Sequence, residues 1–433
     1  MNFSTRVMIA GLATTVAFPA LAQRMPVGGS RTNKTADPNA VPNENADTQT
    51  VTTAATSTTG RKLQVSKEAQ KALIELQAAV NANDTATIPA KLAAAQAVAK
   101  NPDEKFFVAS NQTKAALAAN DLAGIRAGVD AMQLSGGAET PDLVARYTDL
   151  GKRYKVANQI DQAVIVLDKA IALNPNNVAT LINLASVRDA QGQKAEAVAL
   201  MQKSFIASKA TGIKVEEGNY KFATGLAYGQ RLPISNDLAR QWYAAYPSPA
   251  SLRDSIRIYR DLNRPAPGQL IDLLRLARAA NALSGETDYA GFASALINAG
   301  KLAEAKAVLA EARTAPKVDS SKTAFVDLGK RSAVAPTRAA IDAAAKTALA
   351  GGTATALINA GDGLYGAGAF AEAVPLYRAA LAKGGDASLA NMHLGMALAR
   401  SGDKAGATTA LSAATGVHAD VARYWLLWLA TTG

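Results

Sequence analysis

A spacing of 34 residues recurs in the second half of this chain and constrains its fold more than any other feature. Gly361 and Gly368 have counterparts one period later, at Gly395 and Gly402. A fixed period of this length is typical of a helix-turn-helix unit that stacks on the next copy of itself. Strand signals are scarce beyond Leu63, so the sequence predicts a folded part that is nearly all helix.

The clearest copy of the repeat spans residues 147–175. Large and small residues alternate along its two helices, and a proline closes it: Tyr147, Leu150, Gly151 and Tyr154, then Ala163, Leu167 and Ala170, then Pro175. A small residue lets two helices approach closely, and the large residues fill the seam between them. The pattern resembles the tetratricopeptide repeat, W-x2-L-G-x2-Y, then A-x3-F, then P. This resemblance implies an all-α fold, a right-handed solenoid of stacked helix-turn-helix repeats.

Further copies extend the array toward the C-terminus. Adding 34 to the first copy gives Leu181, Leu184, Ala185, Ala197 and Met201, with Gly192 in the turn. Another copy holds Tyr289, Phe292, Ala293, Gly300, Ala305, Leu309, Ala312 and Pro316, and a shortened one begins with Phe325, Leu328 and Gly329. The sequence therefore predicts about ten helix pairs.

An aromatic helix ends the chain and is predicted to cap the array. Tyr424, Trp425 and Trp428 lie on a helix from about Asp420 to Ala430, and no second helix follows it. An end repeat must cover the apolar face of its neighbour, so a half-repeat of this kind suits a cap. A membrane or partner-docking helix is the alternative interpretation.

The N-terminal segment has the pattern of a secretory signal peptide. Arg6 precedes an uncharged apolar stretch, and the small-residue pattern Ala20-Leu21-Ala22 follows it. We expect cleavage after Ala22 and a periplasmic protein, with secretion as the alternative. The apolar stretch is shorter than the roughly 20 residues that span a bilayer, so we expect no membrane span in the mature chain.

Composition shifts divide the chain into seven segments. We predict a signal peptide (1–22), a disordered Thr/Asn/Pro-rich leader (23–62), degenerate helical repeats (63–143), a pair of repeats (144–211), irregular Arg-rich helical repeats (212–285), a repeat array (286–421) and a capping helix (422–433). The leader contains almost no large apolar side chain after Val27, so it cannot bury enough surface to fold.

The composition also limits the chemistry of the chain. It contains no cysteine and only two histidines, His393 and His418, so the means for a metal cluster or a catalytic triad are missing. No phosphate-binding loop, G-x-S-x-G elbow or H-E-x-x-H motif occurs. We therefore expect a protein that is not an enzyme and needs no cofactor or metal. The net charge of +11 favours anionic partners, but nucleic acid fits poorly with export.

A row of polar residues on the first helices is the first candidate binding site. Each member of the row immediately precedes a packed leucine or its equivalent. The members are Asp149, Asn183, Asp327, Asn359 and His393, and Lys152 lies beside the row. In proteins that this chain resembles, the first helices line a groove for an extended peptide, and side-chain amides there hold the peptide backbone. Ordinary solvated polar positions are the alternative interpretation.

An arginine stripe is the second candidate site. Residues 231–280 hold eight arginines and no lysine, and Arg253, Arg257 and Arg260 share one helix face, with Arg264 beyond it. Guanidinium groups bind carboxylate and phosphate as bidentate forks, which suits an acidic polymer or acidic protein. A solvated charged face, paired locally with Asp254 and Asp261, is the alternative.

Two functions follow from these sites. The first is a periplasmic scaffold or adaptor that binds partner proteins or peptides in envelope assembly, secretion, division or polysaccharide export. The alternative is a protein that binds cell-wall or acidic polysaccharide through its Arg-rich helices. Repeats of this kind predict a fold far better than a function.

Overall fold

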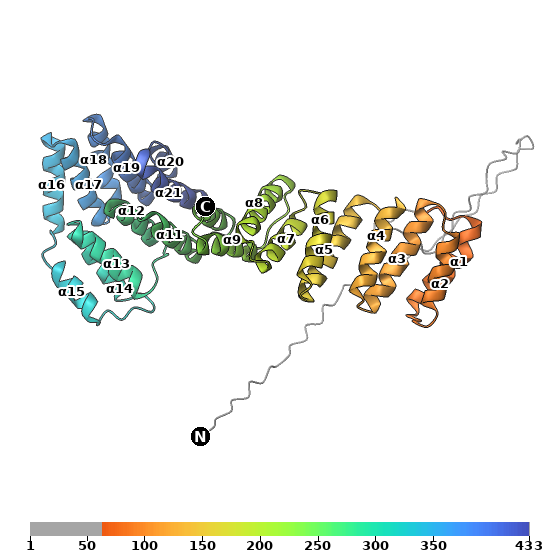
Figure 1. Ribbon diagram of the computed structural model, residues 1–433. Helices are drawn as coiled ribbons and strands as arrows, with labels where there is room; N and C mark the ends of the chain where they lie inside the picture. The colour runs from red at the N-terminus through yellow and green to blue at the C-terminus, as the bar shows by residue number, and fades with distance from the viewer. Residues whose placement is uncertain (1–62, 433) are drawn as a thin grey trace, which may run out of the picture. The chain divides into compact units, whose positions relative to one another are not determined.

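The computed structural model describes residues 63–432 of the chain. The predicted signal peptide (1–22) and leader (23–62) lie outside the described residues. Within residues 63–432, 21 α-helices and one short 3₁₀ turn follow one another without a strand, which confirms the all-α prediction (Figure 1). Twenty of these helices form ten consecutive helix-turn-helix units, and the last one stands alone, as the period predicted.

The first five units contain ten helices. They are α1 (Lys67–Asn81), α2 (Ile88–Val98), α3 (Pro102–Ala118), α4 (Leu122–Ser135), α5 (Thr140–Val156), α6 (Ile160–Leu173), α7 (Val178–Ala190), α8 (Lys194–Thr211), α9 (Glu217–Gly229) and α10 (Ser235–Ala245). Their starts follow local capping chemistry. At α3, the Asn101 side chain accepts from the Glu104 N–H while the Glu104 carboxylate accepts from the Asn101 N–H, which satisfies two free donors.

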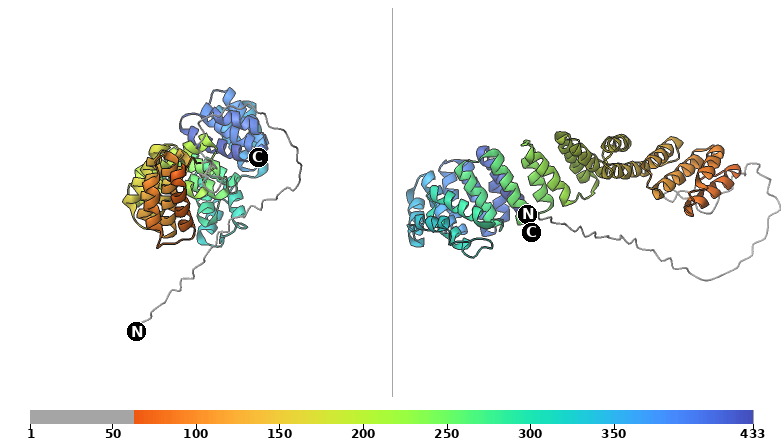
Figure 2. Two further views of the ribbon diagram at one scale, coloured as in Figure 1. Left: turned by 90° about the vertical axis from the view of Figure 1, so that its right-hand side faces the viewer. Right: turned by 60° about the horizontal axis from the view of Figure 1, so that its bottom comes forward.

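The remaining helices complete the array. They are α11 (Pro249–Asn263), α12 (Pro267–Ala279), α13 (Gly285–Asn298), α14 (Leu302–Ala312), α15 (Thr323–Arg331), α16 (Arg338–Gly351), α17 (Ala354–Gly366), α18 (Phe370–Ala382), α19 (Ala387–Ser401), α20 (Lys404–Ser412) and α21 (Ala419–Thr431), with the 3₁₀ turn at Gly416–His418. Successive units lie side by side along the chain (Figures 1 and 2).

Nine of the ten units turn on one residue with a positive φ. These residues are Asn83, Asn120, Asn158, Gly192, Arg231, Arg264, Gly300, Gly368 and Gly402. At Gly402 the φ is 93°, a conformation that glycine adopts without strain. Seven of the nine turn residues are asparagine or glycine, the residues that favour this conformation, whereas Arg231 and Arg264 are exceptions.

Glycines on the first helices set the distance between the two helices of a unit. A Cβ atom on Gly151 would lie 2.5 Å from Cγ of Leu167, and one on Gly361 would lie 2.7 Å from Cε1 of Tyr377. Gly395 faces Leu411 in the same way. These contacts confirm the predicted role of the small residues, because any side chain at these positions would push the helices apart.

The unit α15–α16 departs from the regular packing. Helix α15 packs against α13 and α14, whereas α16 packs against α17 and α18. As a result α14 contacts α17 directly, so the stack continues past the opened unit. The six-residue connection between α15 and α16 contains no positive-φ turn residue, and Val334 within it is 81% exposed.

The last helix confirms the predicted cap and also extends it. Helix α21 packs against α19 and α20, as a cap should, but it also contacts α10 and α12 (Figure 1). Tyr424 and Trp425 are fully buried there, and the Trp425 Nε1–H donates to the carbonyl oxygen of Asp272 at 3.1 Å. Tyr424 and Trp425 are therefore core residues, and the partly buried Trp428 packs against that core, so these rings do not form an exposed docking surface.

Candidate functional site

The predicted polar row reaches the surface where it crosses α5 and α7, with Asp149 exposed and Asn183 half-buried. The Asp149 carboxylate forms an ion pair with Arg153 one turn away, at 2.7 Å, and Lys152 is exposed. The Asn183 Nδ2 donates to the carbonyl oxygen of Ala179 at 2.7 Å, which leaves its Oδ1 free to accept a further hydrogen bond. We call this surface the α5–α7 face.

Polar contacts hold the two helices of the α5–α7 face against each other. The hydroxyl groups of Thr148 and Thr180 lie 2.7 Å apart in the buried layer beneath it. Lys155 on α5 donates to Ser186 on α7 at the surface. Apart from each other, α5 packs only on α4 and α6, and α7 only on α6 and α8, among the helices of residues 63–432 that pack on them closely. The α5–α7 face is therefore rigid and uncovered by any of these helices.

Further along the array, the members of the row differ in their exposure to solvent. Asp327 on α15 is exposed and lies 3.7 Å from the Lys330 ammonium, and Asn359 on α17 is exposed. His393 on α19 is only 6% exposed, because α12 covers it. The prediction that His393 lines an accessible groove is therefore wrong.

His393 belongs to a buried cluster of charged side chains from four helices. We define the buried charge cluster as Asp272 and Arg275 on α12, Lys301 just before α14 and Glu304 on α14, Asp362 on α17 and His393 on α19. The Arg275 guanidinium contacts Glu304 at 2.7 Å and Asp272 at 3.2 Å. The His393 ring lies between two carboxylates, with Nδ1 2.8 Å from Asp362 and Nε2 3.3 Å from Asp272.

The carboxylates control the charge of His393. Burial alone lowers the pKa of a histidine, but Asp362 and Asp272 outweigh burial here and raise the pKa of His393 to about 9. Burial likewise acts to raise the pKa of Asp362, whereas the positive charges of His393, Arg275 and Lys301 hold that pKa well below its usual range. Near neutral pH His393 is therefore a cation held between two carboxylate anions.

Aromatic rings complete the buried charge cluster. The Tyr377 hydroxyl donates to Oδ1 of Asp362 at 2.8 Å, and the Arg275 guanidinium lies 4.7 Å from the centroid of the Tyr365 ring. Each buried charge thus has an opposite charge beside it, as buried ions require. The cluster fastens α12 to the helices around it.

Helix α12 is enclosed on every side. Seven consecutive residues, 271–277, are buried. Ile271 and Leu274 pack into a core with α13 and α14, while Leu273 and Leu276 pack into the core built by α17 to α21. Helix α12 therefore covers His393 on α19, while Lys301, Glu304 and Asp362 of the cluster still border a hollow of about 280 Å3 together with Asn359 on α17.

The arginine stripe falls on α11, as predicted, but its members differ in their surroundings. Arg257, Arg260 and Arg264 line one hollow of about 560 Å3 together with Tyr228, Asp261, Pro265, Leu270, Thr287 and Asp288. Arg253 does not line it. We call this hollow the arginine hollow.

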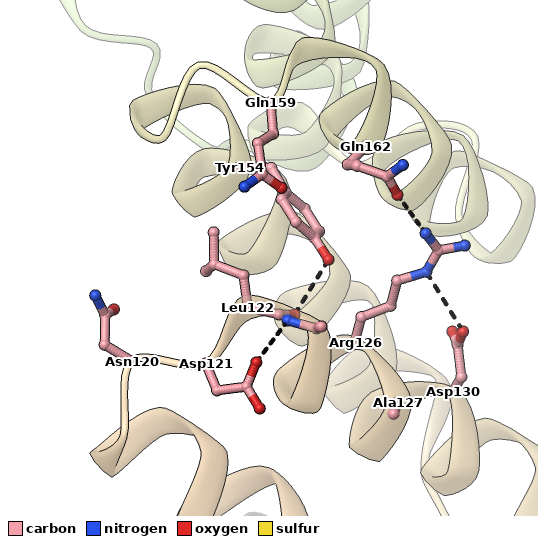
Figure 3. A pocket seen from close by; sticks show the side chains of 10 residues that line it. Asn120, Asp121, Leu122, Arg126, Ala127, Asp130, Tyr154, Gln159 and Gln162 are labelled. Atoms are coloured by element: carbon pink, nitrogen blue, oxygen red, sulfur yellow. Dashed lines mark hydrogen bonds and ion pairs between the residues drawn. The ribbon is translucent and has the colours of Figure 1, made fainter.

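A second hollow, of about 760 Å3, lies where α4 meets α5 and α6 (Figure 3). Arg126 donates to Gln162 across it and lies 3.7 Å from Asp130, and the Tyr154 hydroxyl donates to the carbonyl oxygen of Leu122 at 3.1 Å. The Asp121 carboxylate caps α4. Asp121, Arg126, Asp130, Tyr154 and Gln162 bond to groups of the protein, so these side chains join neighbouring units.

The sequence contained one signal for the buried charge cluster, which our interpretation missed. Asp272 and Arg275 stand three residues apart inside a leucine-rich stretch, the spacing of an ion pair within one helix. We counted Arg275 among the arginines of a surface segment, whereas it is 2% exposed. A charged pair flanked by leucines on both sides indicates a helix that is buried all round.

The described residues contain neither a membrane span nor a metal site of the usual kind. None of the helices in residues 63–432 combines the length and the apolar character needed to cross a bilayer. In the same part of the chain, no three His, Asp or Glu side chains gather in a way that would hold a metal ion.

Comparisons with known proteins bear on the repeat. Residues 166–199 match the family model of the tetratricopeptide repeat, whereas no curated protein matches the sequence. Among solved structures, the chain is similar to a tetratricopeptide repeat protein from Parabacteroides merdae, with 14% identity and a TM-score of 0.30 over 68% of this chain and 99% of that one.

Two further structures show a comparable likeness. One is YrrB, described as a TPR protein with an unusual peptide-binding site, with 15% identity and a TM-score of 0.20 over 57% of this chain and 88% of that one. The other is the TPR2AB domain of yeast Sti1 in complex with pHSP90, with 14% identity and a TM-score of 0.24 over 67% and 100%. At such low TM-scores the fold assignment rests on the helix pairs described above.

Proposed function

We propose that this chain, which contains a tetratricopeptide repeat at residues 166–199, is an exported scaffold that binds a partner protein on its α5–α7 face. The proposal rests on the first helices α5 and α7, which no closely packed helix of residues 63–432 covers. The α5–α7 face presents Asp149, Lys152 and Asn183 on a rigid support, while the corresponding face of α17 and α19 is largely covered by α12.

The side chains of the α5–α7 face suit an extended polypeptide. The Asn183 amide has an acceptor to offer to a backbone N–H, and the exposed Lys152 ammonium offers donors to a carbonyl or carboxylate oxygen. Asp149 and Arg153 form an ion pair in which a charged group of the partner can replace either member: an acidic group can pair with Arg153, and a basic group with Asp149. A tetratricopeptide scaffold that holds a peptide in this way needs no catalytic group, cofactor or metal, and we assign none.

The cellular setting of the proposal comes from the sequence. An N-terminal signal peptide cleaved after Ala22 would deliver the scaffold to the periplasm, or outside the cell. A periplasmic scaffold of this kind would serve envelope assembly, secretion, division or polysaccharide export. Detecting the mature N-terminus at Gln23 in a periplasmic fraction tests the localisation separately from the binding.

Site-specific photo-crosslinking in living cells tests the proposed face. A photoreactive amino acid replaces Lys152 or Asn183 in two separate variants, and the captured proteins are identified by mass spectrometry. The matched control carries the same group at Lys203, an exposed position on the second helix α8. We expect one protein to be captured from positions 152 and 183 and not from position 203.

Loss of capture on substitution completes the test. Asn183→Leu removes the amide, so it should reduce crosslinking from position 152 at unchanged protein level. Asn359→Leu, at an exposed position of α17, should leave that crosslinking unchanged if the partner lies on the α5–α7 face alone. Equal capture from positions 152, 183 and 203, or none from any of them, would contradict the proposal.

A further inference from the structure

The arginine hollow combines groups from three consecutive helix units. Tyr228 comes from α9, Arg257, Arg260 and Asp261 from α11, and Arg264 from the turn that follows α11. Leu270 on α12 with Thr287 and Asp288 on α13 close the opposite wall: these residues lie far apart from Tyr228 in sequence but border the same space. The hollow has a volume of about 560 Å3, which lies within the range of small-ligand sites.

Two of the three arginines in the hollow are not paired with a carboxylate of residues 63–432. Neither Arg260 nor Arg264 forms an ion pair with any carboxylate in residues 63–432. Arg257 is 55% exposed, lies 3.5 Å from Asp254 and stacks its guanidinium over the Tyr228 ring at 5.4 Å. The nearby carboxylate of Asp261 accepts a hydrogen bond from the Tyr228 hydroxyl rather than an arginine.

The backbone of Arg264 is held in a conformation that arginine rarely adopts. Its φ is 47°, in the left-handed region where the turns of seven other units have asparagine or glycine. Arg231 occupies the same position in the preceding unit, with a φ of 50°. Arg231 does not line the hollow, so the two positions share their backbone conformation but differ in their access to a ligand.

The mixed charge of the lining selects the kind of anion. Three guanidinium groups offer bidentate donors to carboxylates. Asp261 and Asp288 also line the hollow and would repel a ligand that carries only negative groups. A sugar acid meets both demands, because its carboxylates bind the arginines while its hydroxyls donate to the two aspartates. Pro265 and Leu270 provide apolar surface for a sugar ring.

We infer that the arginine hollow binds a short acidic oligosaccharide built from uronic acid units. The site is separate from the α5–α7 face and does not depend on the proposed scaffold function. Carboxylates of the sugar contact Arg260 and Arg264, and the ring hydroxyls face Asp261 and Asp288.

Calorimetric titration of the mature chain with a galacturonate trisaccharide tests this inference. We expect binding that weakens as salt is raised, since partly exposed charge pairs are screened. The methyl-esterified trisaccharide, which has the same hydroxyls without charge, should bind far more weakly. A triglutamate peptide, which has the charge without the hydroxyls, should also bind more weakly because of Asp261 and Asp288.

Two matched glycine variants separate binding from folding. Arg264→Gly and Arg231→Gly both relieve the left-handed backbone, so both should keep or raise the melting temperature. Only Arg264→Gly removes a lining guanidinium. We expect it to weaken the binding of the trisaccharide by about 10-fold, the usual loss for a charged hydrogen bond. Arg253→Gln, on α11 but outside the hollow, should leave the affinity unchanged.

Several outcomes would overturn the inference. Absence of trisaccharide binding by the wild-type chain is one, and equal weakening by Arg231→Gly and Arg264→Gly is another. Triglutamate binding as tight as that of the trisaccharide would assign the hollow to an acidic protein segment instead. Binding of the esterified trisaccharide with unchanged affinity would show that the arginines take no part.

Discussion

The first helices of this chain form two surfaces of opposite character. On α5 and α7, polar residues of the repeat face outward and no closely packed helix of residues 63–432 covers them. On α17 and α19, the residues beneath the corresponding face are covered by α12 and joined to it through the buried charge cluster. The same repeat pattern therefore produces a surface for a partner in one region and an internal seam in the other.

The comparison shows what decides between the two outcomes. The repeat residues fix how the two helices of a unit pack, as Gly151 on Leu167 and Gly361 on Tyr377 show equally in both regions. They do not fix what lies over the first helices. That depends on whether a helix from another unit carries the right groups, and α12 does, with Asp272 and Arg275 placed to meet His393 and Glu304.

The largest expected effect comes from breaking the covered region at its central cation. Arg275→Met removes the guanidinium that contacts the buried carboxylates of Glu304 and Asp272, so we expect a loss of ~3–5 kcal/mol in the free energy of unfolding. All three tryptophans of the chain lie at or beyond Trp242, so denaturation followed by tryptophan fluorescence reports on this region.

The matched control removes an ion pair of the same helix at the surface. Arg278 on α12 contacts Glu311 at 3.0 Å, and both side chains are partly exposed. Arg278→Met should cost no more than ~1 kcal/mol. Similar losses in Arg275→Met and Arg278→Met would mean that the buried charge cluster does not hold α12 in place.

The next effect is a pH dependence confined to the covered region. The pKa of His393 is about 9 in the folded state and near 6.5 in the unfolded state. The stability that His393 contributes to the fold is therefore fully present below pH 6.5 and is lost as the pH rises through 9. The shift corresponds to a loss on the order of 3 kcal/mol. Groups facing the ring are Asp272, Asp362 and Tyr377.

Equilibrium unfolding by urea at a series of pH values between 6 and 9.5 measures this loss through tryptophan fluorescence. His393→Gln should be less stable at pH 7 and should lose most of the pH dependence. His418→Gln, at the other histidine, should keep it. A pH dependence that survives unchanged in His393→Gln would place its origin outside the buried charge cluster.

A smaller effect tests the feature that both regions share. Gly361→Ala places a Cβ 2.7 Å from the Tyr377 ring, and we expect a loss of ~1–3 kcal/mol through overpacking. On the same helix, a Cβ on Gly363 would make an ordinary contact with Ile341 at 3.5 Å. Gly363→Ala should therefore gain roughly 0.5–1 kcal/mol. Thermal unfolding followed by circular dichroism distinguishes the two, and equal effects would contradict close packing at Gly361.

The smallest effect is expected on the open face. Asn183→Leu should change the free energy of unfolding by less than ~0.5 kcal/mol, because its amide bonds only to the backbone of its own helix. The same substitution should nevertheless reduce partner capture. A large loss of stability in Asn183→Leu would show that the α5–α7 face has a structural role like that of the covered region.

Much of the fold was predictable, because the repeat residues report on contacts within one unit. Gly192 marked a turn, and the aromatic residues of α21 marked a cap. The site was less predictable. Asp272 and His393 meet across 121 residues of sequence, and no periodic pattern encodes which unit will cover another. From its place in the row, His393 was correctly predicted to lie on the first helix of a unit. The same pattern did not indicate that α12 would cover it.

The return of α21 to α10, α11 and α12 has a consequence for the order of folding. Tyr424 bonds to Ser255 and Tyr243 to Thr431, contacts that join residues 169 and 188 positions apart. An open array folds unit by unit from any point and frays from its ends. Here the thirteen-residue helix α21 completes a core begun nearly two hundred residues earlier, so α10, α11 and α12 reach their native packing only after α21 has been synthesised.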